Sequence, residues 1–326
     1  MIPTGQSGGF VSSTSSRAGM GVGRKKWNSV WRASFPNSFP VSEAPEVSTL
    51  REGSHGLILS TILIQMRPGI LLDPFRWLGR WALDTAAQIG QWGGLGFQTV
   101  RSVQRVDIWG RLLLGQMAKI GVDSVPIALF IATFTGVVMA LQASYTFTGA
   151  VPLYFVGALV GKTMILELGP VLTGLALSGR VGANIAAELG TMRVTEQIDA
   201  LETLAYDPVA YLVVPRVLAG IIMVPIVVIL AVAVGISAGW LTSLYLLDMS
   251  TPEFMKGLRL FFLPWDIQFA AIKSLSFGLT ITSIGCFFGF TTRGGAEGVG
   301  LSTTRAVVVS SMVILVLDAF WAATLL

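Results

Sequence analysis

Five apolar segments, each long enough to cross a membrane, limit this chain to one class of fold. They lie at about 122–142, 157–180, 212–246, 267–291 and 304–326. A helix of about 20 residues spans the ~30 Å hydrocarbon core of a bilayer. Only 12% of the residues are charged, against about 25% in soluble domains. The sequence therefore predicts an all-α integral membrane protein with five transmembrane helices over 122–326.

The N-terminal residues differ in composition from the rest of the chain. The first 42 residues contain five Lys or Arg and no acidic residue, and the first carboxylate is Glu43. A basic, serine-rich segment without acidic residues is typical of an organellar transit peptide, and a disordered tail is the alternative. We therefore predict a transit-peptide-like leader over 1–50.

A polar stripe precedes the first apolar segment. Between 73 and 92, polar side chains recur every four residues and aromatic or aliphatic ones lie on the other side; the polar positions are Arg76, Arg80, Asp84 and Gln88. A helix with Trp and Phe opposite Arg suits the membrane–water interface, and a surface helix packed on protein is the alternative. We expect interfacial amphipathic helices over 51–121.

The basic residues orient the spans. Segment 51–121 contains eight Lys or Arg, the 180–216 connection three and the 293–305 connection two, whereas 143–161 has none and 247–266 has two. The positive-inside bias places the first three regions on one face of the membrane. Small residues at four-residue spacing, among them Gly235/Gly239 and Gly285/Gly289, indicate close helix–helix packing.

Three charged residues interrupt the apolar segments: Glu167, Lys273 and Asp318. A charged side chain at the centre of a membrane helix costs ~2.5–3.5 kcal/mol on insertion scales, so each needs a partner or a wet cavity. Lys162 and Arg180 stand nearer the segment ends, where long side chains can extend to the interface.

Glu167 opens the sequence ELGP, which predicts a local break in the helix. Pro170 cannot donate a backbone hydrogen bond and crowds the carbonyl of Leu166, so the helix should kink or loosen. We assign Gly169 and Pro170 as a candidate hinge. A carboxylate beside loosened backbone indicates a hinge or a polar lining, and a buried ion pair without functional role is the alternative.

The densest acidic stretch, 188–208, lies between two apolar segments. Residues 195–206 have helical spacing, with Ile198 and Leu201 on one stripe and the acidic residues elsewhere. An acidic and partly apolar helix on the basic face of the membrane could dock into a basic groove of a soluble partner. From the residues alone, a solvated acidic loop accounts for the pattern equally well.

Several kinds of chemistry are absent from the sequence. The stretch GALVGKT (157–163) has three residues, rather than four, between its first glycine and Gly-Lys-Thr, so it is not a phosphate-binding loop. A single histidine and a single cysteine support neither a metal cluster nor a hydrolase triad. We expect no catalytic residues and no metal or cofactor on this chain.

The stretch ELGPVLTGLALSGRVGANIAAELGTMRVTEQIDALETLAYDPVAYLVVPR (167–216) resembles the signature region of the MlaE-type permeases. The similarity continues through 272–290 and 303–318 and covers roughly 75–326. These permeases are the membrane subunits of ABC systems that move glycerolipids between membranes. With the leader, the chain is most similar to the plastid members, which serve the trigalactosyldiacylglycerol lipid importer.

The resemblance implies a homodimer that docks one ATPase subunit per copy and an MCE-domain lipid-binding subunit on the opposite side. ATP and magnesium would bind the ATPase, the substrate would be phosphatidate or a related phospholipid, and no nucleic acid would be involved. Residues that would couple to the ATPase are Arg193, Glu196, Asp199 and Glu202. Lys273 and Asp318 match family positions and are candidate partners of Glu167. Leu166 departs from the bacterial pattern, which has arginine there.

Lipid-binding residues are expected on the first span and its exit: Met139, Leu141, Gln142 and Tyr145. The implied location is the inner envelope membrane of the plastid, or a bacterial-type inner membrane if the leader is not a transit peptide. Two other hypotheses stay open at this point. A secondary transporter could use Glu167 and Asp318 as proton or ion sites, and a scaffold or insertase could use the acidic helix for docking.

Overall fold

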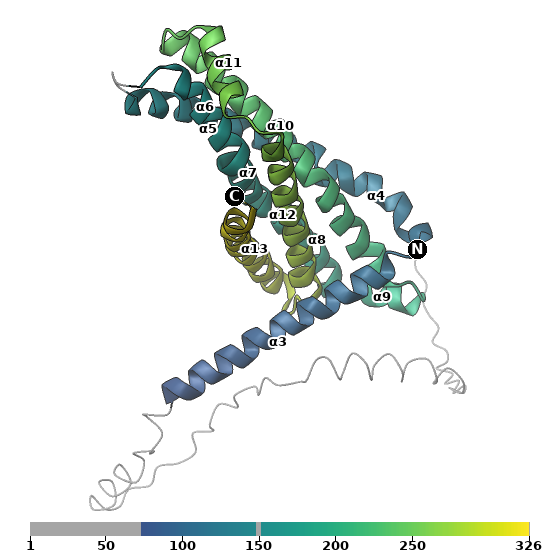
Figure 1. Ribbon diagram of the computed structural model, residues 1–326. Helices are drawn as coiled ribbons and strands as arrows, with labels where there is room; N and C mark the ends of the chain where they lie inside the picture. Colours follow the sequence, from purple (N-terminus) through teal and green to yellow (C-terminus); the bar gives the residue numbers. More distant parts are fainter. Residues whose placement is uncertain (1–72, 148–150, 326) are drawn as a thin grey trace, which may run out of the picture. The chain divides into compact units, whose positions relative to one another are not determined.

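The computed structural model describes residues 73–147 and 151–325, and every regular element in these ranges is helical (Figure 1). The predicted leader over 1–50 lies outside the described residues. The chain divides into two compact units, Met1–Ala87 and Gln88–Leu326. The prediction of an all-α membrane fold is confirmed, since five helical segments are long and apolar enough to cross a bilayer.

The five candidate spans run over Val106–Thr146, Tyr154–Val194, Val209–Leu246, Pro264–Phe290 and Gly295–Leu325. The first combines α4 (Val106–Ile120), the 3₁₀ turn η1 (Val122–Ser124) and α5 (Val125–Thr146). The second joins α6 (Tyr154–Thr163), the π-helix η2 (Met164–Leu168), α7 (Gly169–Leu177), the π-helix η3 (Ser178–Gly182) and α8 (Ala183–Val194). The third is the π-helix η4 (Val209–Val213) followed by α10 (Val214–Leu246).

Three further helices and the last two spans complete the described fold. They are α3 (Asp73–Ser102), α9 (Gln197–Thr203), α11 (Thr251–Leu260), α12 (Pro264–Phe290) and α13 (Gly295–Leu325). The helix predicted from the polar stripe at 73–92 is therefore present within α3. Whether it and α4 lie at the membrane interface stays a prediction.

The second span is longer than the sequence predicts. We expected it to end near Arg180, but helical structure continues to Val194. Small residues replace large apolar ones after Arg180, which lowers the hydropathy without ending the helix. These small residues let neighbouring helices approach: a Cβ at Gly289 would lie 2.6 Å from the Leu189 side chain. The predicted role of the small residues in packing is confirmed.

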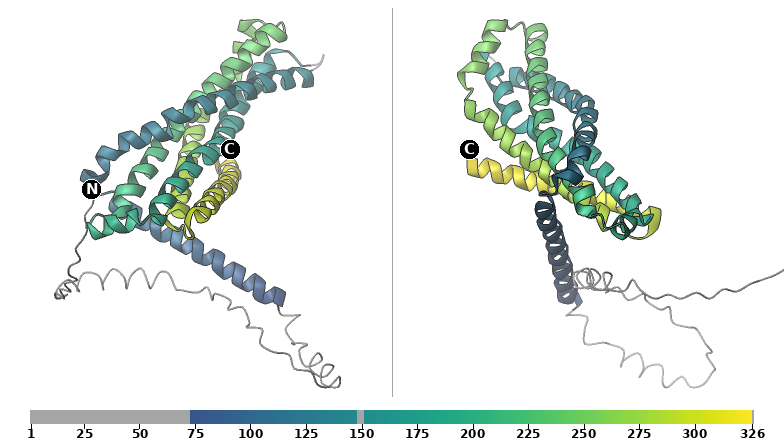
Figure 2. Two further views of the ribbon diagram at one scale, coloured as in Figure 1. Left: turned by 180° about the vertical axis from the view of Figure 1, so that it is seen from behind. Right: turned by 90° about the vertical axis from the view of Figure 1, so that its right-hand side faces the viewer.

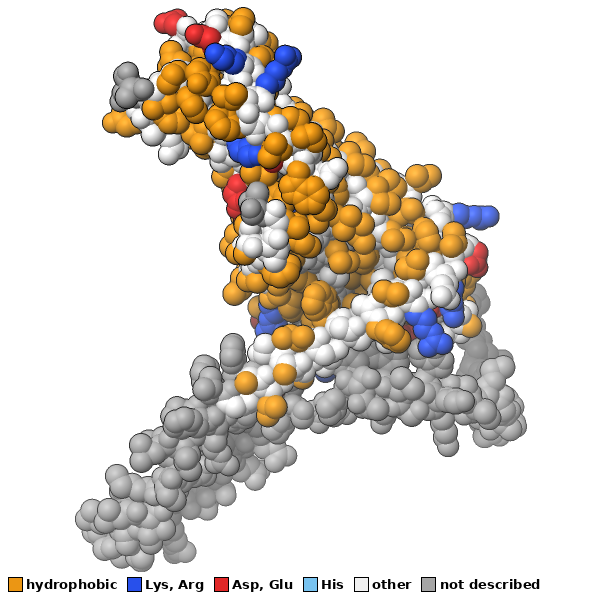
Figure 3. All heavy atoms as spheres, in the orientation of Figure 1, with side chains coloured by type: hydrophobic (Ala, Val, Ile, Leu, Met, Phe, Trp, Pro, Cys, Tyr) orange, Lys and Arg blue, Asp and Glu red, His pale blue; other side chains and the backbone are white. Residues whose placement is uncertain are grey.

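Within the larger unit, α10 is central and packs against α5, α4 and α12, while α12 also contacts α8 and α13. Two helix pairs approach very closely: a side chain on Gly136 would overlap the Gly235 carbonyl, and one on Gly257 would overlap the Tyr154 carbonyl. α9 and the turn before α13 lie at one end of the bundle, and α11 lies at the other (Figures 1 and 2). Hydrophobic side chains cover the helices between these ends (Figure 3).

Candidate functional site

The second span breaks its regular α-helical geometry at the ELGP sequence. Residues Met164–Leu168 form a π-helix, and Gly169 and Pro170 begin the next helical segment. Because Pro170 has no N–H to give, the carbonyl four residues earlier, that of Leu166, lacks its helical donor. Lys273 of α12 replaces that donor, with its Nζ donating to the Leu166 carbonyl at 3.1 Å. The structure thus places an irregular backbone where we predicted a hinge.

Lys273 also connects the two carboxylates that we grouped with it. Its Nζ lies 2.7 Å from Glu167 Oε2 and forms an ion pair with Asp318 of α13. The Lys273 side chain is 0% exposed, whereas those of Asp318 and Glu167 are 13% and 42% exposed. The contact between Asp318 Oδ1 and the ammonium is an ion pair, and this oxygen accepts no hydrogen bond of good geometry. Three helices that are distant in sequence are therefore joined by one buried cation.

The net charge of this membrane charge network and the exposure of its members decide which ligands it could attract. It contains two carboxylates and one ammonium, so its formal charge is negative when all three groups are ionised. The part of it that is accessible is Glu167, which is only half buried. Such a network can hold a helix junction together, and it offers an acidic rather than a basic surface to any ligand.

Lys162 and Arg180, the two cations nearer the ends of the apolar segments, differ in their partners. Lys162 pairs with a carboxylate, whereas Arg180 has no ionic partner among the described residues. The Lys162 ammonium lies 2.8 Å from the almost fully buried Asp266 carboxylate, in the first turn of α12, and its side chain is 33% exposed. That it extends to the membrane interface stays a prediction. Asp266 also accepts the backbone N–H of Leu263 at 3.0 Å, so it fixes the start of α12 as well. The sequence does not reveal this pair, because Asp266 lies just before the apolar segment 267–291 and only tertiary contacts bring it to Lys162.

The acidic stretch forms a short elbow at the basic end of the bundle. α8 ends at Val194, Glu196 adopts a left-handed conformation with φ 59°, and α9 covers Gln197–Thr203. The helix is shorter than the predicted 195–206 because Ala205 is also left-handed, with φ 62°. Ile198 is 1% exposed and anchors the elbow in the bundle.

The four residues proposed to couple to an ATPase lie together on this elbow. Arg193 donates to Asp199 at 2.6 Å, and Glu196, Asp199 and Glu202 are exposed. Neighbouring groups remove part of the hydration of the Glu202 carboxyl and, together with the negative charge of Asp199, raise its pKa. The pair Arg193–Asp199 braces the turn, and the remaining carboxylates face outward, where a basic partner surface could meet them.

A second ion cluster lies beside the elbow and was not predicted. Glu188 accepts from Arg216 at 2.8 Å and from Lys119 at 2.9 Å, which ties α8 to α10 and α4. Arg216 is 4% exposed and also donates to the Leu212 carbonyl. All three residues were visible in the sequence, but their separations along the chain give no periodic signal for such a cluster.

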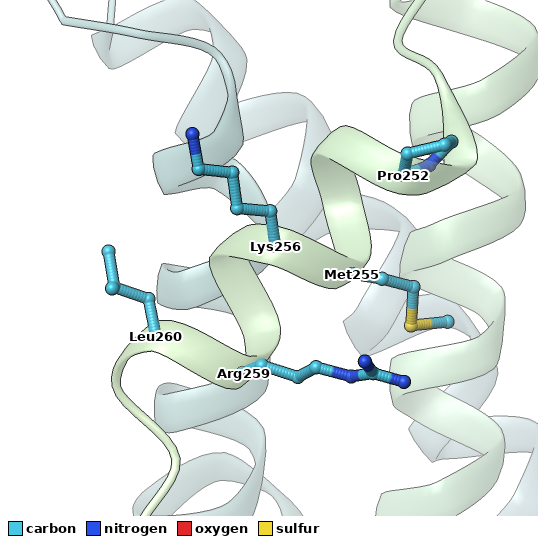
Figure 4. A pocket seen from close by; sticks show the side chains of 5 residues that line it. All are labelled: Pro252, Met255, Lys256, Arg259 and Leu260. Atoms are coloured by element: carbon cyan, nitrogen blue, oxygen red, sulfur yellow. The ribbon is translucent and has the colours of Figure 1, made fainter.

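The expected lipid-binding residues occupy the last two turns of α5. Leu141, Gln142 and Tyr145 are exposed, whereas Met139 packs against a small core cluster that contains Val156 and Met164. A separate open hollow of ≈ 520 Å³ lies on the outer surface of α11 (Figure 4). It is lined by Pro252, Met255, Lys256, Arg259 and Leu260. None of the expected lipid-binding residues contributes to it.

The structure therefore has five candidate membrane spans, a charged junction in their interior and an acidic elbow at the end that carries the basic connections 180–216 and 293–305. The profile of the family described as Permease MlaE matches residues 113–324, well over half of the chain. The chain belongs to the MlaE permease family.

Individual relatives agree with this assignment. The chain is 38% identical over 247 residues to a probable ABC transporter permease protein of Rickettsia felis, covering 76% of this chain and 95% of that one. It is 33% identical over 243 residues to the intermembrane phospholipid transport system permease protein MlaE of Haemophilus influenzae, covering 74% and 93%. It is 37% identical over 232 residues to the chloroplastic protein TRIGALACTOSYLDIACYLGLYCEROL 1 of Arabidopsis thaliana, covering 70% and 66%.

Family membership fixes the class of this chain as a permease and not an enzyme, as the sequence predicted. The spans of the MlaE family core hold the charge network, the hinge and the elbow, since residues 113–324 contain all of them.

Proposed function

We propose that this chain is the membrane subunit of an ABC transporter that moves glycerolipids, phosphatidate or a related phospholipid, between membranes. ATP hydrolysis takes place on a separate ATPase subunit that binds ATP and magnesium. The names of the relatives support this proposal: one is a permease of an intermembrane phospholipid transport system, and another is a chloroplastic protein.

The observation that carries the proposal is the layout of the second span. One helical segment, Tyr154–Val194, contains Glu167 at the charge network and leads directly into the acidic elbow. A force applied at the elbow therefore acts on the same helix that contains the π-helical break and the hinge residues Gly169 and Pro170. Irregular turns of this kind are where helices bend.

The resemblance to MlaE-type permeases implies the rest of the proposed assembly. Two copies of the permease enclose a lipid cavity, and one ATPase subunit docks at each acidic elbow. An MCE-domain subunit exchanges lipid at the end where α11 lies. Alternation between an open and a collapsed cavity moves the lipid, with α5 and the outer half of the second span as lining. The leader and the Arabidopsis relative favour the plastid inner envelope, with a bacterial-type inner membrane as the other location.

Reconstitution tests this function. The permease is purified from its native membrane, its companions are identified, and the complex is placed in liposomes with fluorescent phosphatidate. We expect an ATPase with nucleotide-binding motifs to co-purify and lipid transfer to require ATP. Transfer that proceeds on the permease alone would contradict the proposal.

The second candidate is a secondary transporter, and the clustering of Glu167 and Asp318 around Lys273 favours it. It would move its substrate in response to an ion or proton gradient without ATP. The same liposomes distinguish the two functions when a pH gradient replaces ATP.

A further inference from the structure

The second span differs from the other four in the face that it leaves uncovered. Between Leu159 and Val194, a stretch described throughout, no large hydrophobic side chain is exposed. The other spans each expose several, for example Phe134, Ile229 and Val316. Between Leu159 and Val194, the exposed residues are instead small or polar: Gly179, Asn184, Glu188 and Thr191. A helix face of this composition borders protein or a polar cavity, and not acyl chains.

Arg180 lies on this face and is the one arginine of the second span that lacks a partner among the described residues. It is half-buried within the π-helix Ser178–Gly182. The other cations in the interior of the bundle are all engaged: Lys162 with Asp266, Arg216 with Glu188, and Lys273 with two carboxylates. An arginine in a membrane span without a counter-ion is costly, so it calls for an anionic ligand.

Arg180 cannot satisfy its charge by reaching the basic end of the bundle. It precedes Glu188 by eight residues, which is about 12 Å along a helix. Because Cα–Cβ bonds tilt toward a helix N-terminus, its side chain leans away from that end. The helix α12, which packs against this part of the second span, offers apolar side chains such as Ile284 and Phe287 in that direction, so it provides no polar path for the guanidinium. The guanidinium therefore stays at the level of the small, polar face.

The surroundings of Arg180 suit a phosphate group. A guanidinium presents a planar fork of N–H donors that matches phosphate oxygens. Asn184, one turn further along, is exposed and carries a side-chain amide that can donate as well. Beside Arg180, a Cβ added at Gly179 would meet no atom within 4 Å, so space is open there.

The charge network cannot serve the same purpose. Its single cation is enclosed by two carboxylates and the Leu166 carbonyl. An accessible carboxylate at Glu167 repels a phosphate, and Leu166 supplies no positive charge at that point. A phosphate group passing through the permease therefore needs a cationic site elsewhere.

We propose that Arg180, assisted by Asn184, binds the phosphate group of the transported glycerolipid in the half of its route nearest the acidic elbow. This inference rests on the proposed lipid-transport function and adds a headgroup site to it. It makes Arg180 a determinant of specificity, because neutral lipids gain nothing from the guanidinium.

The test uses the complete transporter in nanodiscs and two photoreactive probes with identical acyl chains, phosphatidate and diacylglycerol. In Arg180→Gln we expect phosphatidate cross-linking to fall about tenfold, the loss of one charge-assisted contact, and diacylglycerol cross-linking to stay unchanged. Arg180→Lys should retain more phosphatidate than Arg180→Gln, since lysine binds phosphate as a point charge. Arg305→Gln is the matched control, because it removes an exposed arginine of α13 and should alter neither probe.

Three results would overturn the inference. Equal loss of both probes in Arg180→Gln would assign Arg180 to packing. Displacement of the phosphatidate probe by inorganic phosphate but not by excess unlabelled phosphatidate would indicate a site for the free ion. Loss of the permease dimer in Arg180→Gln, measured by native mass spectrometry, would assign its counter-ion to a second copy of this chain. ATP-driven lipid transfer by the wild-type complex is measured in parallel, so that failure of the proposed function is recognised separately.

Discussion

Replacing Lys273 with methionine should destabilise the permease more than any other single loss of charge in its described part. Methionine preserves most of the side-chain volume and removes the ammonium that joins Glu167, Asp318 and the Leu166 carbonyl. Because Lys273 is 0% exposed and Asp318 is 13% exposed, that pair behaves as a buried one. Removing one partner of a buried pair costs about 3–5 kcal/mol.

The individual contributions can be estimated from burial. We take the lower end of that range, about 3 kcal/mol, for the Asp318 pair. The Glu167 carboxylate is 42% exposed, so solvent screens its pair and it adds little. The orphaned Leu166 carbonyl adds about 1 kcal/mol. The total of about 4 kcal/mol corresponds to a decrease of about 10 °C in the midpoint of thermal unfolding for a domain of this size.

Thermal unfolding of the purified permease in detergent, followed by intrinsic fluorescence, measures this loss. Lys119→Met is the matched control, because Lys119 is 59% exposed and pairs with Glu188 on the surface; its cost should stay below about 1 kcal/mol. Adding Asp318→Asn to Lys273→Met should restore about half of the loss, since it removes the unpaired carboxylate. If Lys273→Met lowers the free energy of unfolding no more than Lys119→Met, or if the double variant is less stable than Lys273→Met alone, Lys273 does not stabilise the junction as proposed.

Three further predictions concern the elbow, the hinge and α11. Reversing Glu196, Asp199 and Glu202 to lysine should abolish the stimulation of ATP hydrolysis by the permease while membrane insertion is retained, and unchanged stimulation would rule out docking at the elbow. Pro170→Ala supplies the missing N–H to the Leu166 carbonyl, so we expect equal or higher thermal stability with slower lipid transfer; transfer at the wild-type rate would show that the break is not a hinge. The Ser250 backbone N–H donates to Glu253 at 3.1 Å and lowers the pKa of that carboxyl. Because the folded state lowers this pKa, the carboxylate stabilises the fold fully at pH values above the pKa of an unperturbed glutamate. The contribution is lost as the pH falls through the lowered pKa of the folded state. The difference in unfolding midpoint between wild type and Glu253→Gln should therefore disappear on acidification from about pH 7 to about pH 3, and a difference that is independent of pH would contradict this.

Hydropathy predicted the number and order of the spans because each span contains an apolar stretch longer than a bilayer requires. It did not predict where the second span ends, since Gly182, Ala186 and Gly190 preserve the helix while contributing little hydropathy. The left-handed residues Glu196 and Ala205 bound the elbow helix at its start and its end, and neither is a glycine that would have marked a turn in the sequence.

The charged sites differ in how far sequence could reveal them. Pro170 pointed to the unpaired Leu166 carbonyl, because a proline always frees the acceptor four residues earlier. Sequence spacing could not show that Lys273 donates to this carbonyl, since Lys273 lies 106 residues from Glu167 along the chain. Only the family resemblance connected Lys273 and Asp318 with Glu167. The pair Lys162–Asp266 and the cluster around Glu188 were missed for the same reason, because tertiary contacts alone bring them together.

We propose that lipid movement through this permease is driven from outside the chain, through the acidic elbow. The most direct measurement is phosphatidate transfer between liposomes by the native complex, compared with the permease alone and with the complex in which Glu196, Asp199 and Glu202 are reversed. We expect ATP-dependent transfer in the first preparation and none in the other two. Transfer by the permease alone, with or without a pH gradient, would contradict it.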